Sequence, residues 1–406
     1  MDKQPETGDP SETRRLFFED AYRREFAATV TEILVHEGQP AVVLDRTCFY
    51  PESGGQPADA GTLDGAKVVG VHESGPQIVH VLDREVRGPE VRGAIDWERR
   101  FDHMQQHTGQ HILSQCFIEC LDGETKSFHL GAEASTLEIG LAAASDGDLA
   151  RVEDRANSII LDNREVKTYF VPEDNIESVP LRRPPKKSGL IRVVEVSGFD
   201  YSACGGTHCR RTGEVGLIKV IRSEKIRNNL RFEFLCGRRA LRDYAWKNKL
   251  VESLAASLSV HDRDVSAAVE KLTGESRDMR KRLRRLEEAL AVYEAKDIIG
   301  RSESRIVTRV WTDRTAEGAK LLALNIIRSG DLAALFGVAG GERDHLVFAA
   351  SEKLGLNMRE LVSVAQAIAP ARGGGSPSLV EMVIDKGADL EAVLAAAADY
   401  LRQKLV

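Results

Sequence analysis

Residues 97–120, WERRFDHMQQHTGQHILSQCFIEC, decide how the rest of the chain is organised. The stretch lacks proline and its apolar residues suit a helix, although Gly109 costs such a helix about 1 kcal/mol relative to alanine. His107 and His111 are one helical turn apart, so both imidazoles lie on one face and can bind the same metal ion. Because this spacing also arises by chance, the pair alone is weak evidence for a metal site.

A second pair of candidate ligands lies far downstream, in the segment Ala203-Cys-Gly-Gly-Thr-His208. Gly205 and Gly206 suit a tight turn better than a helix interior. A cysteine thiolate and three imidazoles are ligands that zinc prefers in a tetrahedral site. The sequence therefore predicts one Zn²⁺ per chain, held by His107, His111, Cys204 and His208.

Neighbouring residues limit what such a site can be. His103 precedes His107 by one turn, but Cys204 and His208 already complete a tetrahedron, so we expect His103 beside the ligands or on the surface. A zinc protease helix carries a glutamate next to its first histidine, and that neighbour here is Thr108. A purely structural zinc stays open, because four protein ligands normally close a site. Against it stands the long separation between the two ligand pairs.

The hydrophobic pattern divides the chain outward from this helix, and 406 residues are too many for one ordinary domain. Short alternating runs separated by glycine and proline predict strands, and longer periodic runs predict helices. The fold class is α+β. We expect a loose tail at 1–14, a small β-barrel or sandwich at 15–96, an α+β domain with the zinc site at 97–237, a helical hairpin or coiled coil at 238–300, and an α/β domain at 301–406.

Two features of the C-terminal half stand out. From Val265 to Tyr293 apolar residues keep a 4-3 spacing, which is typical of a coiled-coil seam. This seam either folds back on the preceding helix or joins two chains in a homodimer, and the sequence favours neither. The segment Ala371-Arg-Gly-Gly-Gly-Ser-Pro377 predicts a loop, with the glycines and serine at 373–376 open to another backbone or a phosphate.

Composition narrows the class of protein. Apolar residues make up 42% and charged residues 29%, as in globular proteins. No apolar run reaches the roughly 20 residues that span a bilayer, and the N-terminus is polar, so we expect a cytoplasmic protein without a membrane partner. Six scattered cysteines do not suggest a disulfide framework. The net charge of −7 argues against a nonspecific nucleic-acid coat. Local basic clusters still offer an RNA surface, at 99–100, 182–183, 186–187, 210–211, 219–231 and 280–285.

Three ordered motifs carry a resemblance to a known family. Residues 49–61, FYPESGGQPADAG, together with HTGQH and CGGTH, resemble the editing domain of alanyl-tRNA synthetase and its free-standing relatives, the AlaX proteins. The helical region and the glycine-rich C-terminal domain resemble the synthetase's DHHA1 domain, as in the long form of AlaX. The resemblance covers about residues 15–406. It implies zinc at the four ligands and hydrolysis of mischarged Ser-tRNA(Ala), with Gly-tRNA(Ala) as a further substrate, and it leaves no room for an aminoacylation domain.

The difficulty of distinguishing serine from alanine explains why such an enzyme is needed. A pocket for alanine cannot strongly reject serine, which only adds a hydroxyl, so a second site must hydrolyse the error. We expect Thr108, Gln110 or the metal to bind that hydroxyl. Gln110 stands where the synthetases commonly have threonine. The GGQ at 54–56 matches a release-factor tripeptide, but its context favours a glycine turn that lines the cleft. The alternative function is an inactive zinc-containing RNA-binding or scaffolding protein.

Overall fold

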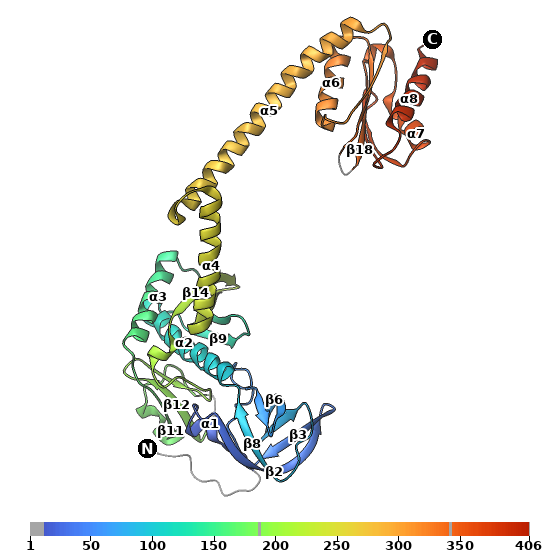
Figure 1. Ribbon diagram of the computed structural model, residues 1–406. Coiled ribbons are helices and arrows are strands. Elements are labelled where there is room, and N and C mark those ends of the chain that lie inside the picture. The colour runs from blue at the N-terminus through green and yellow to red at the C-terminus, as the bar shows by residue number, and fades with distance from the viewer. Residues whose placement is uncertain (1–11, 186–187, 341–342, 406) are drawn as a thin grey trace. The chain divides into compact units, whose positions relative to one another are not determined.

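The computed structural model describes residues 12–185, 188–340 and 343–405 (Figure 1). The chain forms two compact units, Met1–Ser253 and Leu254–Val406. Most of the expected tail lies outside the described residues. Thr13, however, is buried and its hydroxyl donates to Leu44 O at 2.9 Å, so the chain is already packed before residue 15. None of the helices in the described ranges combines the length and the apolar character that a bilayer span requires.

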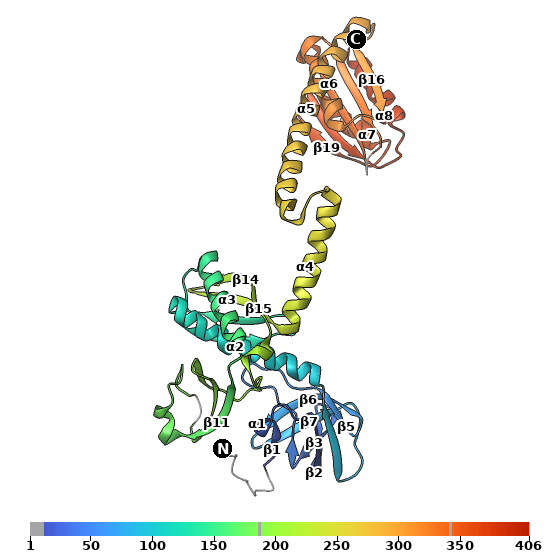
Figure 2. The same cartoon turned by 60° about the vertical axis from the view of Figure 1, so that its left-hand side comes forward.

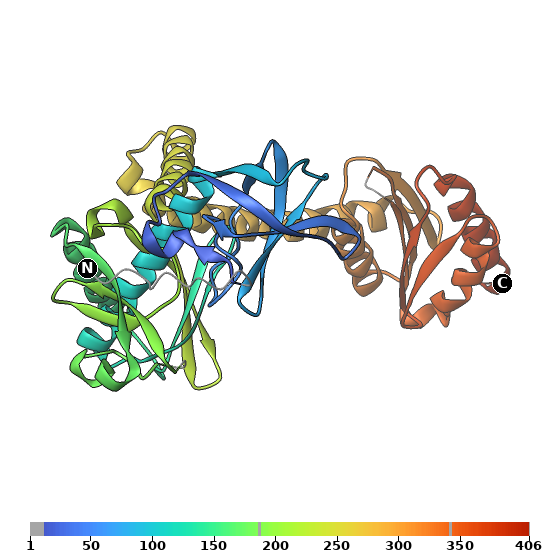
Figure 3. The same ribbon diagram turned by 90° about the horizontal axis from the view of Figure 1, so that it is seen from below.

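A closed barrel of six strands opens the first unit (Figure 3). The apolar positions of its alternating strands point inward and pack around Phe49. The sequence had predicted a barrel or a sandwich, and the structure has the barrel, which leaves no free strand edges. Its strands, in spatial order, are β2 (Glu25–His36), β3 (Gln39–Leu44), β7 (Gln77–Leu82), β6 (Ala66–Ser74), β5 (Gly61–Leu63) and β8 (Glu90–Ile95). The short elements β1 (Arg14–Arg15), α1 (Leu16–Glu19) and β4 (Arg46–Thr47) lie beside it.

The helix predicted from residues 97–120 is α2 (Trp97–Leu121), at the centre of the first unit (Figure 2). Asp96 caps its N-terminus by accepting from Arg99 N, and most of the helix is buried. Around it lie α3 (Asp146–Leu161), the sheet β14-β15-β10-β9 (Ile218–Ile226, Asn229–Cys236, Ser135–Ile139, Thr125–Leu130) and the sheet β11-β12-β13 (Val166–Pro172, Leu190–Val196, Asp200–Ala203). The short helices η1 (Glu173–Ser178) and η2 (Thr212–Val215) complete the α+β arrangement.

A buried ion pair fixes the barrel to α2. Arg100 is fully buried, donates to both carboxylate oxygens of Asp59 and also donates to Cys48 O. Asp59 in turn accepts from Tyr50 N at 2.7 Å. Because both ends of the loop between β4 and β5 are tied to α2, the loop's central turn is held against the helix.

Beyond β15 the chain becomes helical. Helix α4 (Gly237–Leu258) follows directly, and α5 (Val265–Arg301) follows the turn η3 (Asp262–Asp264). The boundary between the two units falls within α4, so the choice between a folded-back hairpin and a dimer stays open.

The second unit has a five-stranded sheet with helices on both faces (Figure 1). The end of α5 and α6 (Ala316–Ser329) pack on one face, whereas α7 (Leu361–Gln366) and α8 (Leu390–Lys404) pack on the other. The strand order is β16 (Ile306–Trp311), β17 (Ala333–Val338), β18 (Asp344–Ala350), β20 (Leu379–Ile384) and β19 (Ala371–Gly375), with η4 (Glu352–Leu354) and η5 (Met358–Glu360) between strands.

The glycine-rich segment corrects one expectation. Residues 371–375 form the edge strand β19, not a loop, and pair antiparallel with β20. A Cβ at Gly373 would lie 2.1 Å from Glu381 O, and one at Gly375 would lie 2.0 Å from Leu379 O. Glycine is therefore required at these two positions by close strand pairing, which propensity alone does not reveal.

Candidate metal centre

The four predicted ligands meet in one buried cluster. Helix α2 presents His107 and His111, and the turn after β13 presents Cys204 and His208. One potential ligand atom from each residue lies within 4.8 Å of the others. Cys204 Sγ is 3.5 Å from His107 Nε2 and 3.4 Å from His208 Nε2. This cluster could hold a metal ion.

Each imidazole is oriented by a separate partner at its other nitrogen. His107 Nδ1 lies 2.9 Å from Gln56 Oε1, His111 Nδ1 lies 3.1 Å from Asp200 Oδ2, and His208 Nδ1 lies 3.3 Å from Thr108 Oγ1. An acceptor at Nδ1 favours the proton there and leaves the Nε2 lone pair free. Metal-binding histidines are commonly fixed in this way, so the donor set fits a metal ion.

Gln56 comes from the barrel and joins both ligand motifs. It is fully buried, and besides facing His107 its Oε1 accepts from Thr207 N at 3.1 Å. Its Nε2 donates to Thr207 Oγ1 at 2.9 Å. The preceding Gly54 and Gly55 adopt φ of 58° and 84°, which places the amide at the end of a tight turn. The sequence predicted the turn but gave no signal that Gln56 bonds to both ligand motifs, at His107 and Thr207.

The second glycine of CGGTH is required by the same contact. A Cβ at Gly206 would lie 2.2 Å from His107 Cε1 and 2.9 Å from Gln56 Oε1. Gly205, by contrast, faces open space. The turn thus approaches α2 closely at one of its two glycines.

Sequence reasoning also missed the partners of His111. Arg182 Nη1 lies 3.2 Å from Asp200 Oδ1 and donates to His111 O at 3.1 Å. The Arg182 side chain is only 11% exposed. Arg182 was expected on an RNA-binding surface with Arg183, and the structure corrects this, because the guanidinium supports α2 instead.

The electrostatics of the cluster favour a cation. Burial by itself would raise the pKa of the Cys204 thiol, but the adjoining His107 and His208 imidazoles hold that pKa well below its usual value. Burial, reinforced by His107, keeps the pKa of His208 well below its usual value. A Cys204 thiolate and a neutral His208 imidazole are the protonation states in which these two groups bind metals.

The other predicted residues are engaged within the protein. Thr108 is fully buried, and its hydroxyl accepts from Cys209 N at 3.0 Å while facing His208. Gln110 Nε2 donates to Ser114 Oγ at 2.8 Å. His103 lies outside the cluster but is buried rather than on the surface, and burial lowers its pKa to about 4.

An aromatic side chain borders the cluster. The Phe128 ring is partly buried and lies against the His107 ring, with a centroid distance of 5.1 Å. A Cβ at Gly55 would lie 3.2 Å from Phe128 Cε1, so the glycine turn and the ring are in contact range. Phe128 was not among the residues that the sequence singled out.

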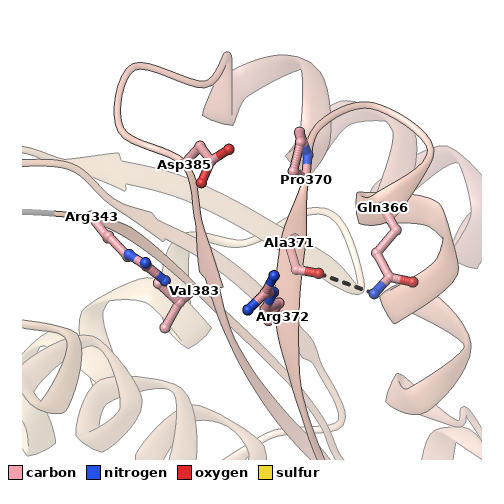
Figure 4. Close-up of a pocket in the computed structure, with 7 residues that line it drawn as sticks. All are labelled: Arg343, Gln366, Pro370, Ala371, Arg372, Val383 and Asp385. Atoms are coloured by element: carbon pink, nitrogen blue, oxygen red, sulfur yellow. Dashed lines mark hydrogen bonds between the residues drawn. The ribbon is translucent and has the colours of Figure 1, made fainter.

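The second unit contains a separate cavity of about 380 Å³ (Figure 4). Arg343 and Arg372 both line it, and neither guanidinium has an ion-pair partner within residues 12–185, 188–340 and 343–405. Asp385 lies at the same cavity, and Gln366 Nε2 donates to Ala371 O at 3.0 Å. The cavity adjoins the glycine-rich strand β19 and carries an excess of positive charge.

Comparison with known proteins identifies relatives along most of the chain. Residues 191–232 match the family described as the threonyl and alanyl tRNA synthetase second additional domain, and residues 19–99 match class II (A) tRNA synthetases. The chain is 29% identical to the alanyl-tRNA editing protein AlaX-L of Pyrococcus horikoshii, over 96% of this chain and 99% of that protein.

Alanine–tRNA ligases are also similar. The enzyme of Pyrococcus abyssi is 29% identical over 92% of this chain, and that of Pyrococcus furiosus is 30% identical over 94%. This chain spans only 42% and 43% of those two ligases. Among solved structures, the C-Ala domain of Aquifex aeolicus alanyl-tRNA synthetase matches 24% of this chain and 88% of that chain at 15% identity, with a TM-score of 0.22 that is too low to support a conclusion. Over nearly its whole length the chain is therefore similar to an AlaX-type alanyl-tRNA editing protein, the family that its three motifs resemble.

Proposed function

We propose that this protein hydrolyses the ester of tRNA(Ala) mischarged with serine, and also Gly-tRNA(Ala), releasing free amino acid and tRNA. The observation that carries the proposal is the four-residue cluster whose three imidazoles each have their own orienting partner. Its similarity to AlaX-L, an alanyl-tRNA editing protein, supports the same reaction. We expect the protein to act where tRNA(Ala) is aminoacylated, in the cytoplasm.

The proposed metal is one Zn²⁺ at His107, His111, Cys204 and His208. A thiolate with three imidazoles suits zinc better than magnesium or calcium, which prefer oxygen ligands. When bound there, zinc supplies a positive charge that can hold the terminal ribose and amino group or lower the pKa of a water. Four protein ligands favour the holding role.

Selectivity for serine requires a polar contact that alanine cannot make. A buried group that pairs with the serine hydroxyl is left unpaired when alanine binds, which costs about 1–3 kcal/mol. Gln110 remains a candidate, and to make the contact its amide must exchange Ser114 for the substrate. Thr108 already serves His208 and Cys209, so its contribution is to orient a ligand. The Phe128 ring supplies an apolar wall that limits the amino acid to small side chains.

The body of the tRNA is the proposed partner of the second unit. Arg343 and Arg372 at the cavity beside β19 are available to phosphates, as is Arg285 of α5. Phosphate contacts would give affinity that falls as salt rises, without sequence specificity.

We also assign the seam of α5 to a homodimer. Leu272, Leu283, Leu286 and Leu290 are each at least 55% exposed on this helix. In the heptad that they define, Glu275 precedes Arg280 by five positions and Arg282 precedes Glu287 by five. Those are the positions that face each other between chains in a parallel, in-register coiled coil, and both pairs are attractive. A second copy therefore complements the seam in apolar spacing and in charge.

The competing function is an inactive RNA-binding or scaffolding protein that keeps zinc for folding alone. Deacylation of Ser-tRNA(Ala), Gly-tRNA(Ala) and Ala-tRNA(Ala) by the purified protein separates the two. The proposal expects release of serine far above spontaneous hydrolysis and little release of alanine. Zinc-loaded, folded protein that releases neither serine nor glycine would favour the scaffold.

A further inference from the structure

Arg192 is a buried cation that lies beside the metal-ligand cluster. It belongs to β12 and is 8% exposed, with Val194 and Val196 following at the alternate positions that face the core. Within the part of the chain that the structure describes, no aspartate or glutamate lies within ion-pair distance of its guanidinium. An unpaired buried charge costs several kcal/mol, so a structural or functional contact must compensate.

The hydrogen bonds of the guanidinium lead to the turn that carries two of the proposed ligands. Cys204 N donates to Arg192 O at 3.0 Å, which extends the β12–β13 pairing by one residue. Arg192 Nη1 donates to Cys204 O at 2.8 Å and to Gly206 O at 2.9 Å. The guanidinium carbon also lies 5.0 Å from the centroid of the Phe18 ring, within the range of a cation–π contact.

These contacts occur where the strand ladder ends. Strand β13 stops at Ala203, so the carbonyls of Cys204 and Gly206 have left the regular pairing and require other donors. A guanidinium presents several donors in a fixed plane, whereas a lysine ammonium is a single point charge.

We propose that Arg192 is a positioning residue of the metal centre, holding the Cys204–His208 turn in the shape that directs Cys204 Sγ and His208 Nε2 toward α2. The inference rests on the metal of the proposed function but not on the hydrolysis itself. The hydrogen bonds of Arg192 end on the carbonyls of Cys204 and Gly206 and not on the ligand atoms, so it acts through the main chain of the turn.

Metal affinity tests this inference directly. The variants are Arg192→Met, which keeps an unbranched apolar side chain but removes every donor, and Arg192→Lys, which keeps the charge but not the planar set of donors. Val194→Ala is the matched control, because it creates a cavity on the same face of the same strand, at a position whose strand partner is Ser202 and not a residue of the turn. The readouts are zinc affinity by competition with a chromophoric chelator, the Co²⁺ absorption spectrum, and the unfolding temperature with and without metal.

We expect Arg192→Met to weaken zinc binding by about 10–100-fold and to change the Co²⁺ spectrum, with Arg192→Lys in between. Val194→Ala should lower the unfolding temperature of the metal-free protein and leave zinc affinity unchanged. Wild-type zinc affinity in Arg192→Met, or an equal loss in Val194→Ala, overturns the inference. If the methionine variant does not fold, Arg192→Lys carries the same comparison. Since no measurement uses tRNA, a protein that binds zinc without deacylating refutes only the proposed function.

Discussion

Replacing Gln56 by methionine should weaken the metal centre from the barrel side. The change removes one amide that serves three buried groups, His107 Nδ1, Thr207 N and Thr207 Oγ1. Each buried polar group left without a partner costs about 1–3 kcal/mol, so the folded protein should lose about 3 kcal/mol or more. Zinc affinity should fall by about 10–100-fold, because one imidazole loses its orienting acceptor.

The assay compares thermal unfolding and zinc competition in three variants and the wild type. Gln56→Glu keeps an oxygen that faces His107 and Thr207 N, so we expect it to retain more zinc affinity than Gln56→Met. Glu52→Ala, an exposed change in the same loop, should behave like the wild type. Zinc affinity in Gln56→Met equal to that of the wild type would refute the idea that the barrel supports the ligands.

Three further predictions concern the cluster, the barrel and the seam. Cys204→Ala should lose both zinc, measured by elemental analysis, and deacylation, since the thiolate is the strongest ligand; full activity would show that it is not one. Burial lowers the pKa of His80 to about 4, below its unfolded value of about 6.5, so the stability that neutral His80 contributes is complete above pH 6.5 and is lost as pH falls toward 4. The free energy of unfolding of His80→Asn, measured with denaturant, should fall by up to about 3 kcal/mol less than that of the wild type as pH is lowered. The loss that remains comes from His103, whose pKa is also lowered by burial. A pH profile identical to that of the wild type would contradict this prediction. Leu286→Lys should convert a dimer to a monomer in analytical ultracentrifugation with unchanged deacylation of a short acceptor-stem mimic, and an unchanged dimer would exclude the seam.

The ligands could be predicted from sequence because their geometry is local. A spacing of four residues on a helix and a glycine turn between Cys204 and His208 each fix a pair of ligands without knowledge of the rest of the chain. Gln56, Asp200 and Arg192 could not be predicted in the same way. Each acts across a long stretch of sequence, and each resembles an ordinary turn, loop or strand residue until the chain is folded.

The fold followed the hydrophobic pattern where that pattern was strong. The alternation of residues 15–96 and the apolar periodicity around His107 match the barrel and α2. The pattern failed at Ala371–Gly375, where three glycines favour a loop by propensity, but close pairing with β20 requires glycine at 373 and 375 within a strand. The prediction that Arg182 lies on an RNA-binding surface was wrong for a related reason, because the sequence does not show which arginine of the pair at 182–183 is buried.

Metal-dependent release of serine from Ser-tRNA(Ala) tests the central claim most directly. The protein is stripped with a chelator, assayed, reloaded with one equivalent of Zn²⁺ and assayed again, with Cys204→Ala treated in parallel. We predict that the stripped protein releases serine at the spontaneous rate, that zinc restores rapid release in the wild type, and that Cys204→Ala does not recover. Release at the spontaneous rate by the reloaded wild type, with zinc bound and the protein folded, would contradict the account.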